Sequence, residues 1–247
     1  MAKTIKSVEK AIKVLDCFFE NEELNINEMV ERTGLNKSTV YDLVNTLEVT
    51  HLIHQNVGNK KYRLGIKMLE FGRLYERQNP VSTVAQKYGE AMAEKFHATV
   101  HLATYQEDQV IYLNKYESPQ VLVSYSRVGK RAPMTCTGLG KAILAFLPEE
   151  YREIHINSKE LPQLTPNSII SKEKLTKELE VTKARGYAID DEEIELGIRC
   201  VAAPLFSNGE VVGAMSISML SPYATKEKIA SVAQEIMEAT STISKII

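Results

Sequence analysis

The stretch GLNKSTVYDLVNTLE, residues 34–48, predicts a helix with two chemically different faces. Apolar side chains recur at the i, i+3, i+4 and i+7 spacing of a face turned toward a core, namely at Val40, Leu43, Val44 and Leu47. An ordinary solvated face would carry Glu and Lys. The opposite face carries short hydrogen-bonding side chains and one phenol instead: Ser38, Tyr41, Asp42 and Asn45, with Lys37 at its start. We therefore expect this face to contact a partner.

The residues before this helix indicate a helix-turn-helix. Asn25, with Glu28 three residues later, is typical of a capping box that opens a short helix, and we expect that helix to end at Thr33. Gly34 suits the left-handed position after a helix, and Asn36 suits the cap of the next one. Two helices joined by so short a turn form a helix-turn-helix.

A helix before this motif and a hairpin after it complete a winged helix-turn-helix. We expect the first helix to be capped by Ser7 and to bury an apolar stripe made of Val8, Ala11, Ile12, Leu15, Phe18 and Phe19. The hairpin is predicted from two strand-like runs, 52–55 and 61–64, that flank the turn-rich segment NVGNK.

Double-stranded DNA is the partner that this arrangement predicts. The exposed helix face would meet base edges in the major groove, and cations on the hairpin would lie near phosphates. The candidate contacts are Lys37, Ser38, Thr39, Tyr41, Asp42, Asn45, Lys60, Lys61 and Arg63. The alternative is a helix-turn-helix in an enzyme or an interaction module, because Asp42 would repel phosphate. Asp42 can, however, accept from a cytosine amino group.

The composition limits how DNA could be bound. The chain has 247 residues, which favours two domains, and a formal net charge of −2, which excludes binding by bulk charge alone. Charge is segregated locally. Residues 1–34 include five basic and seven acidic residues, whereas residues 35–65 include four basic and two acidic residues. The second stretch therefore has the net positive charge that a surface facing phosphates needs.

The cysteines indicate neither disulfides nor a metal site. Cys17, Cys136 and Cys200 are widely spaced, without CxxC or His-Cys ligand spacing, so we expect a reducing cytoplasm, no metal and no cofactor. Charged residues interrupt the apolar positions near the N-terminus, so we expect no signal peptide. No apolar run has the length of a membrane span, so we expect no contact with a membrane.

We expect three regions: a DNA-binding domain at 1–65, a linker and dimerisation helix at 66–80 and an effector-binding domain at 81–247. The segment GIKMLEFGRLYERQN, 65–79, has apolar residues that point in more than one direction. One face cannot bury them all, so this helix is expected to pack on its own domain and on a partner's copy in a homodimer or homotetramer. The alternative is an ordinary buried helix.

The third region is predicted to be an α+β domain with a mainly antiparallel sheet flanked by helices. Strands are expected at 99–106, 109–116, 121–128, 187–190, 200–207 and 210–220, and helices near 81–96, 138–147, 172–185 and 229–243. Asn208-Gly209 between the last two strands is a strong hairpin signal.

Two features of this domain predict a pocket for a small carboxylate. In AMSISML, the side chains of Ala214, Ser216 and Ser218 share one strand face, while the apolar residues between them form the core face. Glycines at the helix start TGLGKAIL expose the N–H groups of Gly138 and Leu139, where an anion is favoured, with Thr137 as the expected cap. The alternatives are a solvated sheet face and a helix start without a ligand.

The order of five stretches resembles the IclR family of bacterial transcriptional regulators along essentially the whole chain. They are ERTGLNKSTVYDLVNTLE, YRLGIKMLEFG, APMTCTGLGKAIL, GYAIDDEEIELGIRCVAAPLFSNG and VGAMSIS. The resemblance implies a dimer or tetramer of chains with a winged-helix domain, a linker helix and an effector domain with a PAS/GAF-like sheet. It also implies regulation of catabolic genes.

For the pocket, the resemblance implies effector contacts from the Gly138-Leu139 backbone, Asp190, Ile198, Cys200, Ser216 and Ser218. An Asp190 carboxylate suits a ligand hydroxyl, so an effector with a hydroxyl and a carboxylate is expected; the alternative is that Asp190 caps the acidic loop. Many relatives have His-Ala-Thr at 135–137, so Cys136 is expected to alter the polarity of the pocket.

The sequence therefore predicts a ligand-responsive regulator, more specifically a repressor, of a near-palindromic operator and not an enzyme. Two alternatives use the thiols. In one, a cysteine senses oxidants on the same DNA-binding frame; in the other, Cys136 or Cys200 is the nucleophile of an enzyme.

Overall fold

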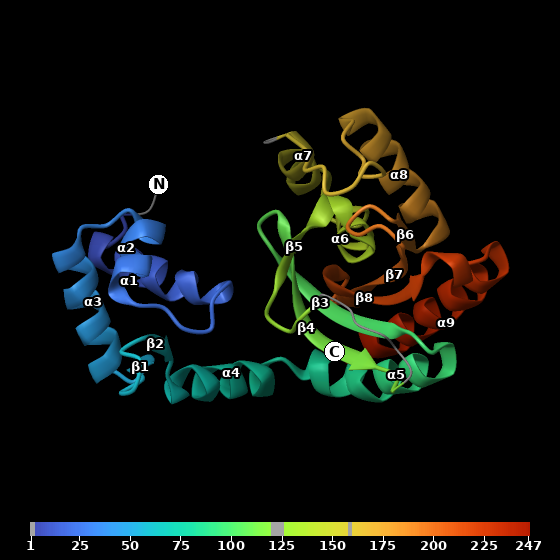
Figure 1. Cartoon of the computed structure of the whole chain (residues 1–247). Coiled ribbons are helices and arrows are strands. Elements are labelled where there is room, and N and C mark those ends of the chain that lie inside the picture. Colours follow the sequence, from blue (N-terminus) through green and yellow to red (C-terminus); the bar gives the residue numbers. More distant parts are fainter. Residues whose placement is uncertain (1–2, 120–125, 158–159) are drawn as a thin grey trace. The chain divides into compact units, whose positions relative to one another are not determined.

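The computed structural model describes residues 3–119, 126–157 and 160–247. These residues form two compact units, Met1–Asn79 and Pro80–Ile247 (Figure 1).

The first unit is a three-helix domain with a small hairpin, followed by a further helix. Its elements are α1 Lys6–Asp16, the 3-10 turn η1 Cys17–Phe19, α2 Ile26–Thr33, α3 Lys37–Val49, β1 Ile53–Gln55, β2 Tyr62–Leu64 and α4 Ile66–Gln78. The two strands pair antiparallel, and Leu24 forms a bridge with Tyr62. One apolar core joins the helices to the hairpin through Val14, Met29, Val44 and Ile53.

Local cap chemistry sets the helix-turn-helix geometry as predicted. The Asn25 side chain accepts from the Glu28 N–H, and the Glu28 carboxylate accepts from the Asn25 N–H, which completes a capping box. Gly34 has a φ of 66°, in the left-handed region. The Asn36 side chain accepts from the Thr39 N–H at 2.8 Å, so α3 begins where the cap predicts.

The first helix differs from its prediction in two respects. It begins at Lys6 without a side-chain cap, so the capping role of Ser7 was wrong. Val14 and Phe18 are buried, whereas Val8 and Ile12 are half-exposed or more. Packing of α1 on α3 selects the stripe that passes through Val14, and a periodic pattern with apolar residues on two neighbouring stripes does not distinguish between them.

The second unit is an α+β domain around a six-stranded antiparallel sheet with the order β5-β4-β3-β8-β7-β6. The strands are β3 Thr99–Gln106, β4 Gln109–Glu117, β5 Arg131–Pro133, β6 Ala188–Asp191, β7 Ile198–Ser207 and β8 Glu210–Leu220. Asn208 and Gly209 both have positive φ in the β7-β8 turn, as the hairpin signal predicts. Of the strand predicted at 121–128, residues 121–125 lie outside the described residues, and 126–128 are not strand.

Helices cover both faces of the sheet (Figure 1). The helices are α5 Pro80–Phe96, α6 Gly138–Leu144, α7 Glu149–Asn157, α8 Lys172–Arg185 and α9 Lys226–Ser244, with 3-10 turns η2 Met134–Cys136 and η3 Ser221–Tyr223. Met215 and Ile217 pack with α5 and α9, whereas Ala214 packs with α6 and α8. The predicted alternation along β8 is confirmed, and it divides the domain into two cores.

A close approach of two backbones fixes the position of α6. A Cβ at Gly140 would come within 2.1 Å of the Met134 carbonyl oxygen, so this helix can touch η2 only because position 140 has no side chain. The Thr137 hydroxyl accepts from the Gly140 N–H at 2.9 Å, which confirms the predicted cap of α6.

We expect Gly140→Ala to lower the free energy of unfolding by about 1–3 kcal/mol, because backbone must move to admit the methyl group. Gly72→Ala is the matched control: it lies in exposed α4, where a Cβ meets open space, and should stabilise the helix by about 0.5–1 kcal/mol. Urea unfolding followed by circular dichroism measures both. Equal effects of the two substitutions would contradict the close packing of α6 on η2.

Candidate functional site

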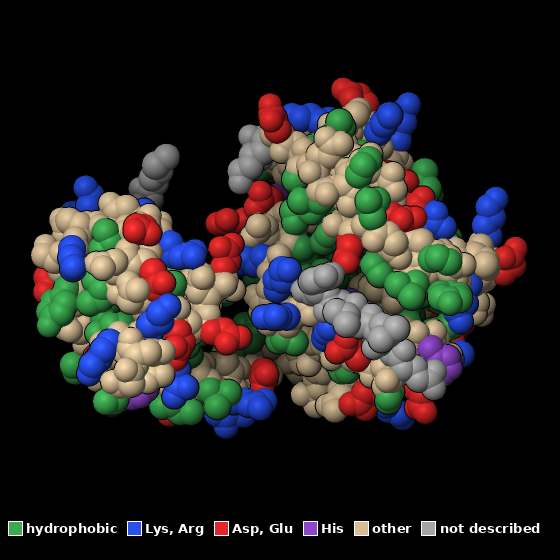
Figure 2. Space-filling model, in the orientation of Figure 1, with side chains coloured by type: hydrophobic (Ala, Val, Ile, Leu, Met, Phe, Trp, Pro, Cys, Tyr) green, Lys and Arg blue, Asp and Glu red, His purple; other side chains and the backbone are tan. Residues whose placement is uncertain are grey.

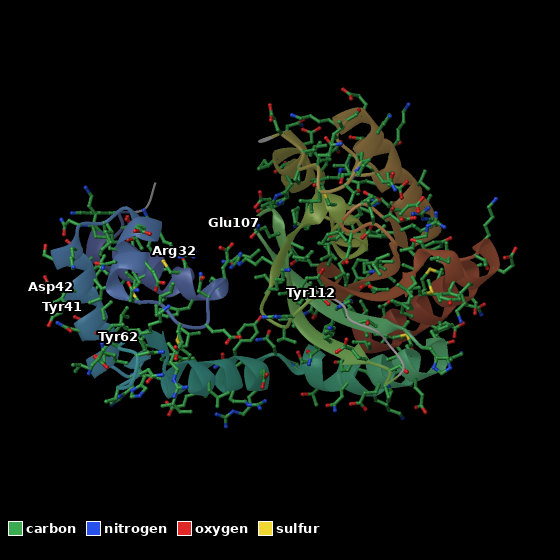
Figure 3. The ribbon with its side chains drawn as sticks, viewed as in Figure 1. Arg32, Tyr41, Asp42, Tyr62, Glu107 and Tyr112 are labelled. Carbon is green, nitrogen blue, oxygen red and sulfur yellow. The ribbon has the colours of Figure 1, made fainter. Side chains whose placement is uncertain are left out.

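The first candidate site is the exposed face of α3. Ser38, Tyr41, Asp42 and Asn45 are all exposed, while Val40, Val44 and Leu47 are buried in the core. Figure 3 labels Tyr41 and Asp42 on the outer side of this helix. Lys37 is exposed at the helix start, and Thr39 is half-buried there. The two faces predicted from the periodicity are therefore present.

The hairpin divides its cations between two roles. Lys60 and Arg63 are exposed, as a phosphate contact requires. Lys61 is half-buried, and its ammonium lies 3.3 Å from the Glu28 carboxylate, so it joins the hairpin to α2. The predicted phosphate contact of Lys61 stays a prediction, and the sequence did not reveal this ion pair, because the partner lies 33 residues away in the sequence.

Acidic residues also hold the hairpin and limit its net charge. The Glu23 carboxylate accepts from the Asn59 side chain at 2.7 Å and from the Asn56 side chain at 3.3 Å. These bonds, the first above all, lower the pKa of Glu23. On the face of the first unit that Figure 2 shows, basic and acidic side chains are interspersed. Any DNA contact made here therefore depends on individual cations more than on a continuous basic patch.

The second candidate site is a cavity of about 1050 Å³ in the second unit. All seven residues predicted for the pocket line it: Gly138, Leu139, Asp190, Ile198, Cys200, Ser216 and Ser218. The cavity lies on the sheet face opposite the α5-α9 core, where Cys200 and Ser218 pair across β7 and β8. Both side chains are small, so they leave room above this part of the sheet.

Asp190 is the most strongly perturbed acid in this cavity. It is 1% exposed; one carboxylate oxygen accepts from the Glu193 N–H at 2.8 Å, and the other has no hydrogen-bond partner. Burial raises the pKa of Asp190 to about 7. Asp190 therefore caps its loop and also offers a free oxygen to the cavity.

A buried ion pair that sequence reasoning missed lies behind Asp190. Lys141 of α6 bonds to Glu193, and the two side chains are 1% and 5% exposed. A lysine within the apolar run GLGKAIL was the available signal, since a buried lysine needs a partner. The pair joins the start of α6 to the loop that Asp190 caps.

The two buried cysteines do not form a reactive site. Burial, with the Asp190 charge next in effect, raises the pKa of Cys200 well above its ordinary value, so this thiol stays protonated. Its sulfur lies 3.1 Å from the Ser218 hydroxyl. Cys136 does not line the cavity, contrary to expectation, because its thiol turns away and donates to the Pro162 carbonyl at 3.2 Å.

His101 is a further lining residue that sequence reasoning missed. Its Nε2 lies 2.6 Å from the Ser126 hydroxyl, and its ring packs against Tyr112 with centroids 5.1 Å apart. Tyr112, labelled in Figure 3, also lines the cavity from β4. Burial lowers the pKa of His101 to about 3, so the imidazole is neutral. A histidine between Val100 and Leu102 of an apolar strand was the signal that could have found it.

Family models match both units of the chain. The "IclR helix-turn-helix domain" matches residues 7–56, and "Bacterial transcriptional regulator IclR C-terminal" matches residues 74–245. The chain belongs to the IclR family of bacterial transcriptional regulators. Its homologues are DNA-binding transcriptional regulators and not enzymes.

Three similar proteins cover nearly the whole of this IclR-family chain. The HTH-type transcriptional regulator XynR of Escherichia coli K12 is 32% identical, over 98% of this chain and 96% of XynR. The crystal structure of Thermotoga maritima IclR is 31% identical, with a TM-score of 0.77 over 98% and 99% of the two chains. An IclR homologue of Microbacterium hydrocarbonoxydans, complexed with 4-hydroxybenzoate, shares the fold at 21% identity, with a TM-score of 0.86 over 98% and 100%.

Neither a metal centre nor a membrane span is found in the part of the chain that the structure describes. Within the described residues of this IclR-family protein, His, Cys, Asp and Glu form no cluster of three that could hold a metal ion. Over the same residues, no helix combines the length and apolarity that crossing a bilayer needs.

The raised pKa of Asp190 predicts that the free energy of unfolding depends on pH. The folded-state pKa of Asp190 exceeds its ordinary value of 3.8. The contribution of Asp190 to the free energy of unfolding is therefore fully present at pH 3 and is lost as the pH rises from about 4 to about 7. Asp190→Asn should remove this loss, so its advantage in free energy of unfolding over wild type should grow between pH 4 and pH 8 to about 4 kcal/mol. Urea unfolding across this range measures it. The exposed neighbour Asp191→Asn is the control, and a pH-independent difference for Asp190→Asn would contradict the burial of its charge.

Proposed function

We propose that this IclR-family protein is a ligand-responsive repressor that binds a near-palindromic operator and answers to a small organic acid in the cytoplasm. The observation that carries the proposal is the cavity of about 1050 Å³, which holds a buried, half-partnered acid, in a chain that also has a helix-turn-helix domain. A concave pocket with a few convergent polar groups is the common form of a small-molecule site. Repression is the simplest outcome when the same chain occupies an operator.

The DNA contacts in this proposal follow from exposure. The face of α3 reads base edges, while Lys37 and Thr39 lie at the entry of that helix into the groove. Lys60 and Arg63 contact phosphates. Lys61 acts indirectly, because its pairing with Glu28 holds the hairpin in place.

A homodimer or homotetramer completes the operator-binding unit. One winged helix reads too few base pairs for an operator, and two copies related by a two-fold axis read a near-palindrome. In support, α4 exposes Ile66, Leu69, Phe71, Leu74 and Tyr75 within a single chain. We assign the regions 1–65, 66–80 and 81–247 to DNA binding, linkage with dimerisation, and effector binding.

The effector is a carboxylate that also carries a hydroxyl. The N–H groups of Gly138 and Leu139, at the first two positions of α6, have no carbonyl within the helix to bond, and they favour an anion. Ser216 and Ser218 complete the carboxylate site, and Asp190 takes the hydroxyl. The 4-hydroxybenzoate named for the Microbacterium homologue bears both groups. Binding of the effector would alter the placement of two DNA-binding domains through the linker helices.

A comparison of two substitutions tests the DNA half. Lys60→Ala should weaken binding to all sequences and reduce the salt slope by about 1, because it removes one phosphate contact. Asn45→Ala should cost about 1–3 kcal/mol on the preferred site only, since it removes a base contact. Fluorescence anisotropy at several salt concentrations measures both, on fragments selected from random DNA by the wild-type chain. Lys177→Ala, on the surface of α8, is the charge-matched control, and equal losses on every fragment for both variants would refute the division of roles.

Substitutions in β8 test the proposed binding of an effector. Ser216→Ala with Ser218→Ala should leave DNA binding unchanged and weaken binding of hydroxy acids found in a thermal-shift screen by at least roughly tenfold, because two hydrogen bonds are lost. Calorimetry measures the affinity. Ser241→Ala, exposed on α9, is the control. Wild-type affinity in the double variant would show that the acid binds elsewhere.

A further inference from the structure

The turn of the hairpin in the first unit has no apolar anchor of its own. It comprises residues 56–61, between β1 and β2, and none of these residues is buried. Val57, its one aliphatic side chain, is 79% exposed. This turn nevertheless carries Lys60, and Arg63 follows on β2. The placement of both cations therefore depends on how the turn is held by polar contacts.

Two asparagines shape the backbone of the turn. The Asn56 side-chain oxygen accepts from the Gly58 N–H at 3.0 Å, and the Asn59 side-chain oxygen accepts from the Lys61 N–H at 2.9 Å. Lys60, between them and β2, has a φ of 60°, a left-handed conformation that is uncommon for residues other than glycine. Because each carboxamide uses its oxygen within the turn, its NH2 group can donate elsewhere.

The Glu23 carboxylate accepts from both of these NH2 groups. Its Oε2 lies 2.7 Å from Nδ2 of Asn59, and its Oε1 lies 3.3 Å from Nδ2 of Asn56. Asn56 begins the turn, and Asn59 lies directly before Lys60. Hydrogen bonds to an ionised acceptor are about twice as strong as neutral ones. One side chain therefore ties the turn at two points.

Glu23 is itself fixed by the residue that follows it. Leu24 is 2% exposed and packs in the core of the first unit. Its N–H donates to the Tyr62 carbonyl at 2.9 Å, and its carbonyl accepts from the Tyr62 N–H at 2.8 Å. The backbone at 23–24 is therefore bonded to β2, and Glu23 connects the turn to the core.

Two opposite effects on DNA binding follow from this position of an acid. Its charge repels phosphate, but water and salt screen an exposed charge beyond about 8 Å at physiological ionic strength. Its hydrogen bonds order the turn before DNA arrives, so binding does not have to supply the entropy of ordering. The change in affinity on removing Glu23 shows which effect is larger.

We propose that Glu23 is a positioning residue for DNA binding: its carboxylate holds the turn so that Lys60 and Arg63 meet phosphates, and its removal weakens binding. The inference rests on the proposed phosphate contacts of the hairpin. It adds a residue that acts on DNA binding through its contacts with Asn56 and Asn59 and without touching DNA.

Removing Glu23 and its neighbour Glu22 in the full chain tests the direction of the effect. Glu23→Ala should lower affinity for every fragment by at least roughly fivefold in about 0.1 M salt and reduce the salt slope by about 1–2, because up to two phosphate contacts are lost. Fluorescence anisotropy over a range of salt measures both, on the fragments selected by the wild-type chain and on a duplex of unrelated sequence.

Glu22→Ala is the matched control. Glu22 is exposed and has no hydrogen bond or ion pair with any residue that the structure describes. Its removal changes the net charge by the same amount, so affinity should stay the same or rise. If Glu23→Ala likewise leaves affinity unchanged or raises it, the positioning role is wrong.

Glu23→Gln separates hydrogen bonding from charge. The glutamine oxygen still accepts from the two carboxamides, while the negative charge is gone. This variant should bind DNA within about threefold of wild type, because the turn keeps its acceptor. A loss as large as that of Glu23→Ala would refute the assignment of the effect to these hydrogen bonds.

A double-mutant cycle shows whether Glu23 acts through the two cations. In a chain that carries Lys60→Ala and Arg63→Ala, Glu23→Ala should change affinity by less than about twofold, because no cation remains to be positioned. An undiminished loss in this background would reveal a general defect of the domain and overturn the proposal. Circular dichroism verifies folding, and Asn59→Ala, which removes the shorter of the two bonds, replaces Glu23→Ala if that variant does not fold.

The outcomes separate this inference from the proposed function. If Lys60→Ala with Arg63→Ala leaves DNA binding unchanged, the proposed phosphate contacts fail, and the role of Glu23 fails with them. If these two substitutions weaken binding and Glu23→Ala does not, the phosphate contacts stand and only the role of Glu23 is wrong.

Discussion

The buried ion pair between Lys141 and Glu193 is the interaction on which the cavity depends. Lys141 lies three residues after Gly138 on α6, and the N–H of Glu193 donates to Asp190. The pair therefore holds the helix start against the loop that Asp190 caps. Removing either partner would leave a buried charge, which costs about 3–5 kcal/mol, so these two walls cannot separate cheaply.

The sheet then divides stability from binding between its two faces. On one face, Met215 and Ile217 pack against α5 and α9 and form an ordinary apolar core. On the other face, Ala202 packs with residues of α6, whereas Ser216 and Ser218 line the cavity. Because adjacent strand residues point in opposite directions, one strand contributes to both. Substitutions on the cavity face can therefore change the shape and polarity of the cavity while the apolar core is preserved.

In the DNA-binding unit, charged residues are likewise divided between structural contacts and exposed positions. Glu23 holds the hairpin by accepting a hydrogen bond from Asn59, and Glu28 holds it by pairing with Lys61. Part of the positive charge of the hairpin therefore stabilises the fold. Lys60 and Arg63 remain exposed. In the proposed function, base reading therefore rests on hydrogen bonds at the exposed face of α3, which suits a protein whose net charge is −2.

The sequence by itself determined the elements whose cause is local. The capping box at Asn25, the left-handed Gly34 and the alternation along β8 each depend on residues only a few positions apart, and all are present. The exposed face of α3 followed from helical periodicity alone. For the pocket, local signals identified Gly138, Leu139, Ser216 and Ser218, and the family resemblance added Asp190, Ile198 and Cys200.

Only the tertiary structure decided which distant groups meet. Lys141 and Glu193 are 52 residues apart, Lys61 and Glu28 are 33 apart, and Ser218 and His101 are 117 apart. Such pairs depend on strand order and helix packing, which periodicity does not specify. For the same reason the core stripe of α1 was predicted wrongly, and the sequence did not reveal that the buried Cys136 thiol bonds the Pro162 carbonyl. A local pattern states which side chains are apolar or polar, but the packed neighbour decides which of them it covers.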